Sequence, residues 1–161
     1  MAFIQWNIHG FQANREQVRL LFKEHNPAAI CLQETKLRDL SPNIGSNYVF
    51  FRSPPLIGIR AHGGTGVIVQ KSVNHRVVQL NTVLQACAVQ VFTTKWITLC
   101  SLYLDPNLED RLQDRSNNPR HLELNDLQIL INQLPHPFIL MWISIPNMPC
   151  GGNLIVIDGV T

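Results

Sequence analysis

At 161 residues the chain has the length of one domain, and 45% hydrophobic with 15% charged residues is the balance of a globular protein, not of a disordered one. The net charge of +2 excludes the strongly basic balance that would by itself identify a nucleic-acid-binding protein. The sequence starts without a basic, then apolar leader and has no run near the ~18 apolar residues of a membrane span, which argues against secretion and membrane insertion.

The first third of the sequence predicts a strand, a helix and a second strand. Phe3–Ile8 alternates apolar and polar side chains, as a strand does. The helix is expected from Ala13 to about His25, with a stripe at Val18, Leu21, Phe22 and His25, and Asn26-Pro27 should end it. Ala28–Gln33 is a nearly continuous apolar run, typical of a strand covered on both faces. This order indicates an α/β layer.

The middle of the sequence is rich in short strands separated by polar turns. The expected strands are 47–52, 65–70, 76–80, 86–93 and 96–104. Their close spacing predicts an antiparallel meander.

The last third begins with a polar, charged loop from Asn107 to Arg120. Helical spacing follows at Leu124, Leu127, Ile131 and Leu134, and Pro135 should end that helix. A further strand is expected from Phe138 to Met141. No internal repeat, low-complexity tract or long linker divides the chain, so we expect one domain over residues 1–161.

The four cysteines Cys31, Cys87, Cys100 and Cys150 lie far apart and form no CxxC pair. This spacing does not indicate a zinc site. We expect reduced, mostly buried thiols of an intracellular protein, either nuclear or cytoplasmic.

Polar residues follow several of the apolar strands, where α/β sheets usually build their sites. Asn7 follows the first strand, Glu34 the second, and Tyr103 and Asp105 a later one. Taken singly, Glu34 could be a solvated surface group, Asn7 a turn residue and Tyr103 an aromatic at a strand end. Their combination is what indicates a site.

Four short motifs occur in a fixed order. They are Trp6–Gly10 (Trp-Asn-Ile-His-Gly), Leu32–Thr35 (Leu-Gln-Glu-Thr), Gly63–Val67 (Gly-Gly-Thr-Gly-Val) and Ser101–Asn107 (Ser-Leu-Tyr-Leu-Asp-Pro-Asn). Together they resemble the exonuclease-endonuclease-phosphatase superfamily, and most of all the apurinic-endonuclease-like domains of jockey-type non-LTR retrotransposons. The resemblance covers residues 3–141 and leaves a divergent tail at 142–161.

The resemblance implies an α/β (α+β) fold of the DNase I type, a two-sheet β-sandwich flanked by helices, with the C-terminal part missing. It also implies a Mg²⁺-dependent endonuclease that nicks DNA, with Mn²⁺ as a possible substitute. A reverse transcriptase domain is expected in the full-length element but is absent from this chain. The oligomeric state stays open.

The resemblance assigns roles to three residues. Glu34 would bind the metal ion, whose Lewis acidity stabilises the scissile phosphate. Asn7 would hold Glu34 and the metal shell through its amide. Tyr103 would hydrogen-bond a phosphate oxygen.

Other groups in the sequence give weaker evidence for a functional site. Gly63 and Gly64 indicate a turn with positive φ and not a phosphate cradle, since the P-loop lysine is missing. Six arginines either contact DNA phosphates or form a solvated face: Arg15, Arg19, Arg60, Arg111, Arg115 and Arg120. Four scattered histidines receive no role: His62, His75, His121 and His136.

The resemblance breaks after Met141. The superfamily continues with Gly-Asp-Phe-Asn, whose Asp activates water and whose Asn orients the phosphate, whereas this chain continues Trp142-Ile143-Ser144-Ile145. The superfamily's terminal Asp-His pair is also absent. Codons shifted by two nucleotides permit Asp-Phe-Asn at this point, so we hypothesise a frameshift near Met141; nucleotides without such a shifted motif would exclude it.

These losses predict little or no cleavage, since general-base activation of water is worth ~10²- to 10⁴-fold in rate. The alternative function is a catalytically inactive remnant, at most a weak nucleic-acid-binding module. A phosphoinositide or sphingomyelin phosphodiesterase is less well supported by these motifs. Missing strands would also leave sheet edges and apolar faces uncovered, which favours aggregation.

Overall fold

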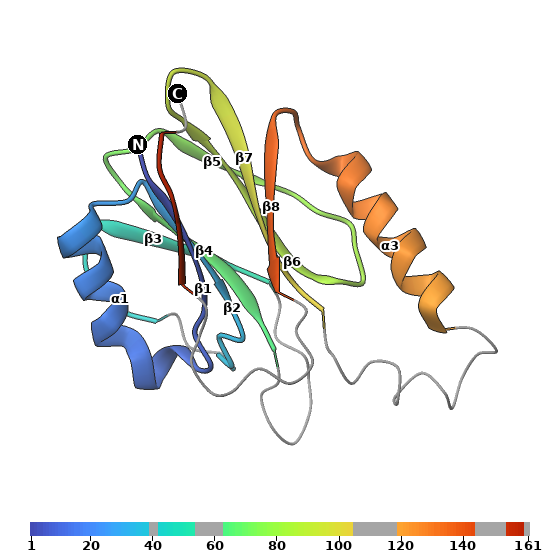
Figure 1. Ribbon diagram of the computed structural model, residues 1–161, viewed down its shortest axis with the longest axis horizontal. Helices are drawn as coiled ribbons and strands as arrows, with labels where there is room; N and C mark the ends of the chain where they lie inside the picture. Colours follow the sequence, from blue (N-terminus) through green and yellow to red (C-terminus); the bar gives the residue numbers. More distant parts are fainter. Residues whose placement is uncertain (39–41, 54–62, 105–118, 144–153, 160–161) are drawn as a thin grey trace.

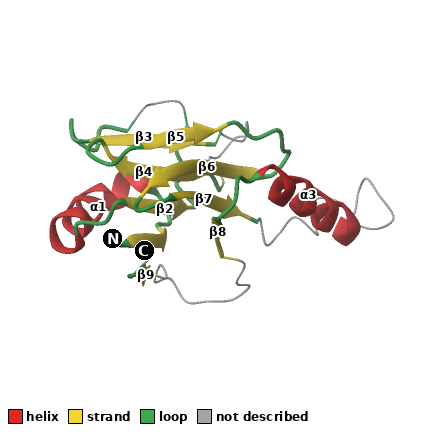
Figure 2. Cartoon of the chain, turned by 90° about the horizontal axis from the view of Figure 1, so that it is seen from above, coloured by secondary structure: helices red, strands yellow, loops and turns green. Residues whose placement is uncertain are grey.

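Two β-sheets lie face to face, and each carries one helix on its outer side (Figures 1 and 2). The computed structural model describes residues 1–38, 42–53, 63–104, 119–143 and 154–159, with the backbone alone for 119–123 and 143. The expected two-sheet sandwich flanked by helices is confirmed. Within these ranges, neither helix is long and apolar enough to cross a membrane.

The first sheet has the strand order β3-β4-β2-β1-β9. Its strands are β1 (Phe3–Asn7), β2 (Ala29–Gln33), β3 (Tyr48–Arg52), β4 (Thr65–Gln70) and β9 (Leu154–Ile157). β1 and β2 are parallel and are joined by helix α1 (Phe11–His25), whereas all other neighbours are antiparallel. The carboxyl ends of β1 and β2 therefore lie at the same edge of the sheet as the start of β4.

The second sheet has the order β5-β6-β7-β8. Its strands are β5 (His75–Val78), β6 (Gln85–Phe92), β7 (Trp96–Tyr103) and β8 (Phe138–Ile143). β7 and β8 are parallel, and helix α3 (Pro119–Gln133) lies between them in the sequence. Each sheet thus contains one parallel pair whose connection includes a helix.

The expected single meander is only partly right. β3 pairs with β4, and β5, β6 and β7 form an antiparallel meander, but β4 and β5 lie in different sheets. The turn after Gln70 carries the chain from one sheet to the other because β4 already has two partners, β3 and β2. A short turn between two predicted strands does not show that these strands pair with each other.

Strand β9 was not expected at all, because the sequence analysis assigned no element to residues 142–161. It pairs antiparallel with β1 and forms one edge of the first sheet. Its residues Leu154, Ile155 and Val156 are all exposed. An apolar run this short has no periodicity that separates a strand from an irregular segment.

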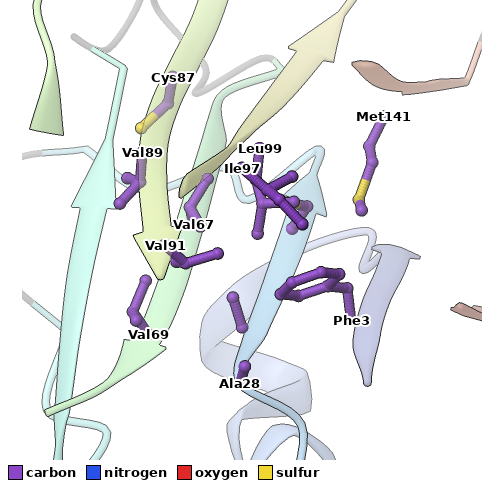
Figure 3. Close-up of a cluster of buried hydrophobic side chains, with 12 residues drawn as sticks. Phe3, Ala28, Val67, Val69, Cys87, Val89, Val91, Ile97, Leu99 and Met141 are labelled. Carbon is purple, nitrogen blue, oxygen red and sulfur yellow. The ribbon is translucent and has the colours of Figure 1, made fainter. Parts of the chain in front are cut away.

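Alternation along the strands divides the core into three layers. Between the sheets, one face of the first sheet packs on the second (Figure 3), with Phe3, Cys31, Val67 and Val69 against Cys87, Val89, Val91, Ile97, Leu99 and Met141. The opposite face of the first sheet packs on α1, and that of the second on α3. Successive residues of a strand point to opposite faces, so a nearly continuous apolar run makes both faces apolar, as expected for β2, whose five residues are all buried.

The two helices differ in how fully they pack. Helix α1 buries Phe11, Val18 and Phe22 and ends at Asn26, whose φ of 44° is the left-handed conformation of a helix cap. Helix α3 buries Leu130. Two expected stripe members are wrong, since His25 and Leu124 are exposed.

Three of the four cysteines, Cys31, Cys87 and Cys100, are free and buried, as expected. Burial raises the pKa of Cys87 and of Cys100 to about 12, and it raises the pKa of Cys31 well above its ordinary value. These thiols stay protonated near neutral pH and are packing residues. Cys150 lies outside the described residues.

Candidate functional site

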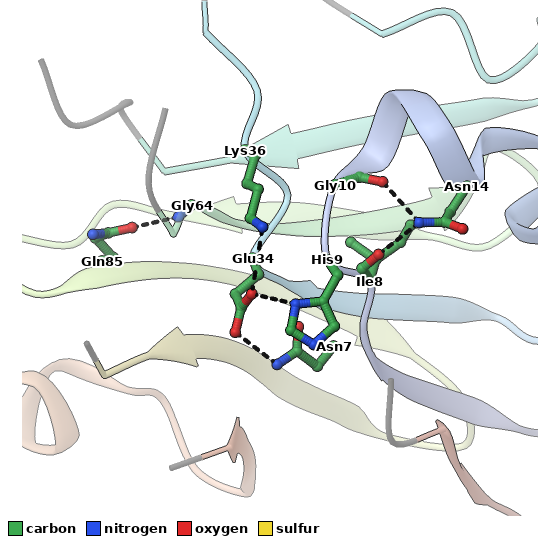
Figure 4. A network of polar contacts seen from close by, with 9 residues as sticks. All are labelled: Asn7, Ile8, His9, Gly10, Asn14, Glu34, Lys36, Gly64 and Gln85. Carbon is green, nitrogen blue, oxygen red and sulfur yellow. Dashed lines mark hydrogen bonds and ion pairs between the residues drawn. The ribbon is translucent and has the colours of Figure 1, made fainter. Parts of the chain in front are cut away.

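Several loops meet where β1 and β2 end and β4 begins (Figure 4). The parallel register pairs Asn7 with Gln33, so the residues that follow these strands emerge side by side. Backbone bonds then tie the loops together: Gly10 N donates to Glu34 O at 2.8 Å, and Lys36 N donates to Gly63 O at 2.9 Å. The site is built from strand ends that the sheet itself aligns.

The side chains of Asn7 and Glu34 point toward each other, as the sequence analysis required. Asn7 Nδ2 donates a hydrogen bond to Glu34 Oε1 over 3.0 Å. The other amide atom, Asn7 Oδ1, is buried and has no hydrogen-bond partner among the described residues. A buried polar atom without a partner costs free energy, so its presence is typical of a site that binds something more.

Two cationic or basic side chains that the sequence analysis did not assign also contact Glu34. His9 Nδ1 lies 2.6 Å and Lys36 Nζ 3.9 Å from Glu34 Oε2. The Glu34 side chain is only 17% exposed, whereas those of His9 and Lys36 are 47% and 43% exposed. A sequence signal for them exists: His9 and Lys36 each stand two residues after a predicted site residue, in the loops that follow two adjacent parallel strands.

The loops that carry these side chains adopt a costly backbone conformation. His9, Glu34 and Lys36 have φ values of 49°, 53° and 50°, in the left-handed region that non-glycine residues rarely occupy. Each such residue costs of order 1 kcal/mol or more, and such residues concentrate at functional sites. Asn14 offsets part of this cost, since its Nδ2 donates to both Ile8 O and Gly10 O.

The glycine pair before β4 connects this group of loops to the second sheet. Gly63 and Gly64 have φ values of 60° and 85°, as the sequence analysis expected. A Cβ at Gly63 would lie 2.5 Å from Gln85 Oε1 and 2.6 Å from Tyr103 Cε1. Gly64 N donates to Gln85 Oε1. The Tyr103 ring therefore packs where only a glycine leaves room.

Tyr103 itself ends β7 and is partly buried. It approaches Gly63 from the second sheet, and Gly63 O accepts a hydrogen bond from Lys36 N in the Glu34 loop. The structure thus joins Asn7 and Glu34 by a direct hydrogen bond and links Tyr103 to them through the glycine turn.

A buried polar contact holds the two sheets together directly beneath Glu34. Gln33 is fully buried, and its Nε2 donates to Ser101 Oγ at 2.9 Å and to Met141 O at 3.3 Å. Ser101 Oγ in turn donates to Leu32 O at 2.8 Å. Since Gln33 precedes Glu34, this contact fixes the strand end from which the carboxylate projects.

The end of β8 contributes no comparable polar side chain. The parallel register pairs Leu102 with Trp142 and Tyr103 with Ile143. Trp142 is 48% exposed, and Phe138–Ile143 contains neither a carboxylate nor an amide side chain. The strand end nearest to Tyr103 is therefore apolar.

This site fits a metal ion held by few protein ligands. Within the described ranges, no three His, Cys, Asp or Glu side chains lie close enough to form a closed cage. Glu34 and the unpartnered amide oxygen of Asn7 could instead serve as two ligands of such an ion, with water or a phosphate oxygen supplying the others. Such a set suits a catalytic ion better than a structural one.

Several groups that the sequence analysis named lie outside the described residues. Five of them have no described placement: Arg60, His62, Asp105, Arg111 and Arg115. Arg15 and Arg19 are described on α1, where Arg15 Nε lies 3.5 Å and Arg19 Nη1 2.8 Å from Glu16 Oε1. Their expected contact with DNA stays a prediction.

Comparison with known proteins gives one family and many related folds. Residues 4–142 match the endonuclease/exonuclease/phosphatase family. The AP endonuclease LMAP from Leishmania major is similar with a TM-score of 0.62 at 20% identity, covering 88% of this chain and 54% of that chain. No curated protein matches the sequence.

Two further solved structures have the same fold. The endonuclease domain of TRAS1, a telomere-specific non-LTR retrotransposon, gives a TM-score of 0.58 at 15% identity, covering 88% of this chain and 57% of that chain. The 3′ phosphatase NExo from Neisseria, bound to product DNA hairpin, gives 0.57 at 15% identity, covering 88% and 56%. This chain spans little more than half the length of these structures.

Proposed function

From the premise that the chain belongs to the endonuclease/exonuclease/phosphatase family, we propose a site for divalent-metal-dependent hydrolysis of DNA phosphodiester bonds, centred on Glu34. The family membership that the four motifs predicted is confirmed, and so is the DNase I-like fold. The observation that carries the proposal is the 3.0 Å hydrogen bond from Asn7 Nδ2 to Glu34 Oε1. It joins residues from two separate sequence motifs.

Glu34 and Asn7 are the residues that would hold the ion. Glu34 provides a partly exposed carboxylate, and Asn7 orients it while its Oδ1 remains available. Mg²⁺ is the expected ion and Mn²⁺ an alternative, since both accept few protein oxygens together with water and phosphate. Bound there, the ion would stabilise negative charge on the scissile phosphate.

The neighbouring side chains suit a phosphate substrate. Lys36 is 43% exposed and can reach a phosphate oxygen from the solvent side while remaining near Glu34. Tyr103, at the end of β7, can donate its phenol O–H to a phosphate oxygen. In these roles Lys36 and Tyr103 would donate hydrogen bonds to phosphate oxygens, on which negative charge develops during hydrolysis.

DNA is the proposed substrate. Similar structures include an AP endonuclease, a retrotransposon endonuclease domain and a phosphatase bound to product DNA hairpin. The net charge of +2 gives little nonspecific attraction to phosphates, so binding by this chain should be weak and should weaken further with added salt.

Cleavage by this chain should be slow. The end of β8 carries Trp142 and Ile143, where the family places its water-activating Asp. Loss of a general base alone costs ~10²- to 10⁴-fold in rate. This observation also favours the second candidate function, a weak nucleic-acid-binding module without catalysis.

A plasmid-nicking assay tests the proposal. The chain is incubated with supercoiled DNA and either Mg²⁺ or Mn²⁺, beside Glu34→Ala and the matched variant Glu24→Ala, in which an exposed glutamate of α1 is removed. We expect slow, metal-dependent nicking that Glu34→Ala abolishes and Glu24→Ala leaves unchanged. Nicking that survives Glu34→Ala would remove Glu34 from the mechanism. Salt-sensitive DNA binding without nicking would favour the second candidate.

A further inference from the structure

His9 is the closest neighbour of the Glu34 carboxylate and has no part in the proposed function as stated. Its Nδ1 lies 2.6 Å from Glu34 Oε2, while Asn7 occupies the other carboxylate oxygen (Figure 4). The His9 side chain is 47% exposed, so the pair borders solvent. Glu34 therefore presents one oxygen to an amide and the other to an imidazole.

The backbone on both sides of His9 is fixed. Ile8 N donates to Gln33 O, and Gly10 N donates to Glu34 O. Asn14 Nδ2 binds the carbonyl oxygens of Ile8 and Gly10 at 2.8 and 3.1 Å. His9 is thus held in its left-handed conformation between two anchored neighbours, and its ring is held against the carboxylate instead of moving freely on the surface.

We propose that His9 Nδ1 and Glu34 Oε2 together bind one divalent transition-metal ion, which makes the site prefer Mn²⁺, and ions of its class, to Mg²⁺. This inference rests on the proposed function, because it assigns the metal class of that same site. Donor atoms about 2.1 Å from one ion and at a right angle to each other lie about 3 Å apart. The two atoms are now 2.6 Å apart, so they would separate by about 0.4 Å to admit the ion. Asn7 Oδ1, buried and unpartnered, lies on a residue that already contacts Glu34.

The preference follows from the donor types. Mg²⁺ takes oxygen ligands almost exclusively. First-row transition metals also bind imidazole nitrogen, and Mn²⁺, which itself favours carboxylate and water ligands, is the weakest binder of the series. Replacing one oxygen ligand by a nitrogen therefore favours Mn²⁺ over Mg²⁺. The nearby Lys36 ammonium disfavours any cation equally and does not change the preference.

Two roles share the observed geometry. His9 either binds the ion or only orients Glu34 by donating its N–H. The other described histidine with a fixed ring, His75, uses its Nδ1 against Val73 O at 2.6 Å and has no such carboxylate partner. A direct view of nitrogen in the metal's coordination separates the two roles for His9.

Metal binding by the full chain tests the proposal at one fixed pH near neutrality. Affinities for Mn²⁺ and Mg²⁺ are measured by calorimetry, and pulsed electron paramagnetic resonance on bound Mn²⁺ detects a coordinated imidazole nitrogen. The variants are His9→Ala, His9→Gln, Glu34→Ala and, as the matched control, His25→Ala, in which an exposed histidine of α1 is removed. Circular dichroism establishes that each variant folds.

We expect the chain to bind Mn²⁺ at least about tenfold more tightly than Mg²⁺, with a nitrogen signal. His9→Ala and His9→Gln should lose the signal and most of the preference, with Mg²⁺ affinity changed much less, and His25→Ala should behave as the unchanged chain. If the unchanged chain binds Mn²⁺ and Mg²⁺ with equal affinity and shows no nitrogen coupling, this inference is overturned and the proposed function stands. Metal binding that is absent, or that survives Glu34→Ala, would overturn both.

Discussion

The two parallel strand pairs of the molecule share one architecture but end differently. β1 and β2 end in the contacts that join Asn7, His9 and Lys36 to Glu34, whereas β7 and β8 end in Tyr103 beside Ile143. Both pairs are connected through a helix and both are covered on two faces. Burial therefore accounts for both strand pairs, whereas the polar side chains that follow β1 and β2 are not needed to form a buried parallel pair.

The largest expected effect comes from making the second strand end resemble the first. Replacing residues 142–145 by the family's Gly-Asp-Phe-Asn should raise metal-dependent nicking by about 10²-fold or more, because it restores a general base and a phosphate-orienting amide. The rate of plasmid nicking measures this, with the same replacement in a Glu34→Ala background as the control. An unchanged rate in a folded variant would show that the end of β8 does not limit activity.

The next effect tests whether the first strand end depends on its glycine turn. Gly63→Ala should lower the free energy of unfolding by about 2–5 kcal/mol, since the new Cβ meets Gln85 and Tyr103 at a positive φ. Gly159→Ala is the matched control, because its φ is 76° but no atom of the described residues, its chain neighbours aside, lies within 4 Å of the new Cβ. It should cost about 1–2 kcal/mol. Equal losses in urea denaturation would contradict the close packing of Tyr103.

The smallest expected effect concerns the contact that joins the two pairs. Gln33→Leu and Ser101→Ala should each lower the free energy of unfolding by about 1 kcal/mol, and together by about 0.5 kcal/mol less than their sum, because they remove a shared hydrogen bond. Ser72→Ala, at an exposed serine, should add to Gln33→Leu without coupling. Full additivity of the Gln33 and Ser101 changes would argue against this inter-sheet contact.

Much of this arrangement was predictable from sequence, and the omissions have physical reasons. Apolar patterns predicted eight of the strands. The motifs predicted that Asn7 and Glu34 lie together after two strands, and the structure shows them in contact there. Periodicity could not reveal that β4 and β5 separate into two sheets, because pairing depends on distant partners. The contact of His9 with Glu34 was not predicted: its spacing from Asn7 is visible in the sequence, but side-chain patterns do not encode the left-handed backbone at position 9.

The left-handed backbone at His9 and Lys36 lowers the stability of the fold, while the side chains at these positions contact Glu34. Glycine would relieve the conformational strain at either residue, yet it would remove the imidazole or the ammonium that faces Glu34. Selection for thermal resistance alone would therefore erode these two side chains first. A descendant of this sequence with glycine at both positions should have a higher free energy of unfolding and would lack both side chains that contact Glu34.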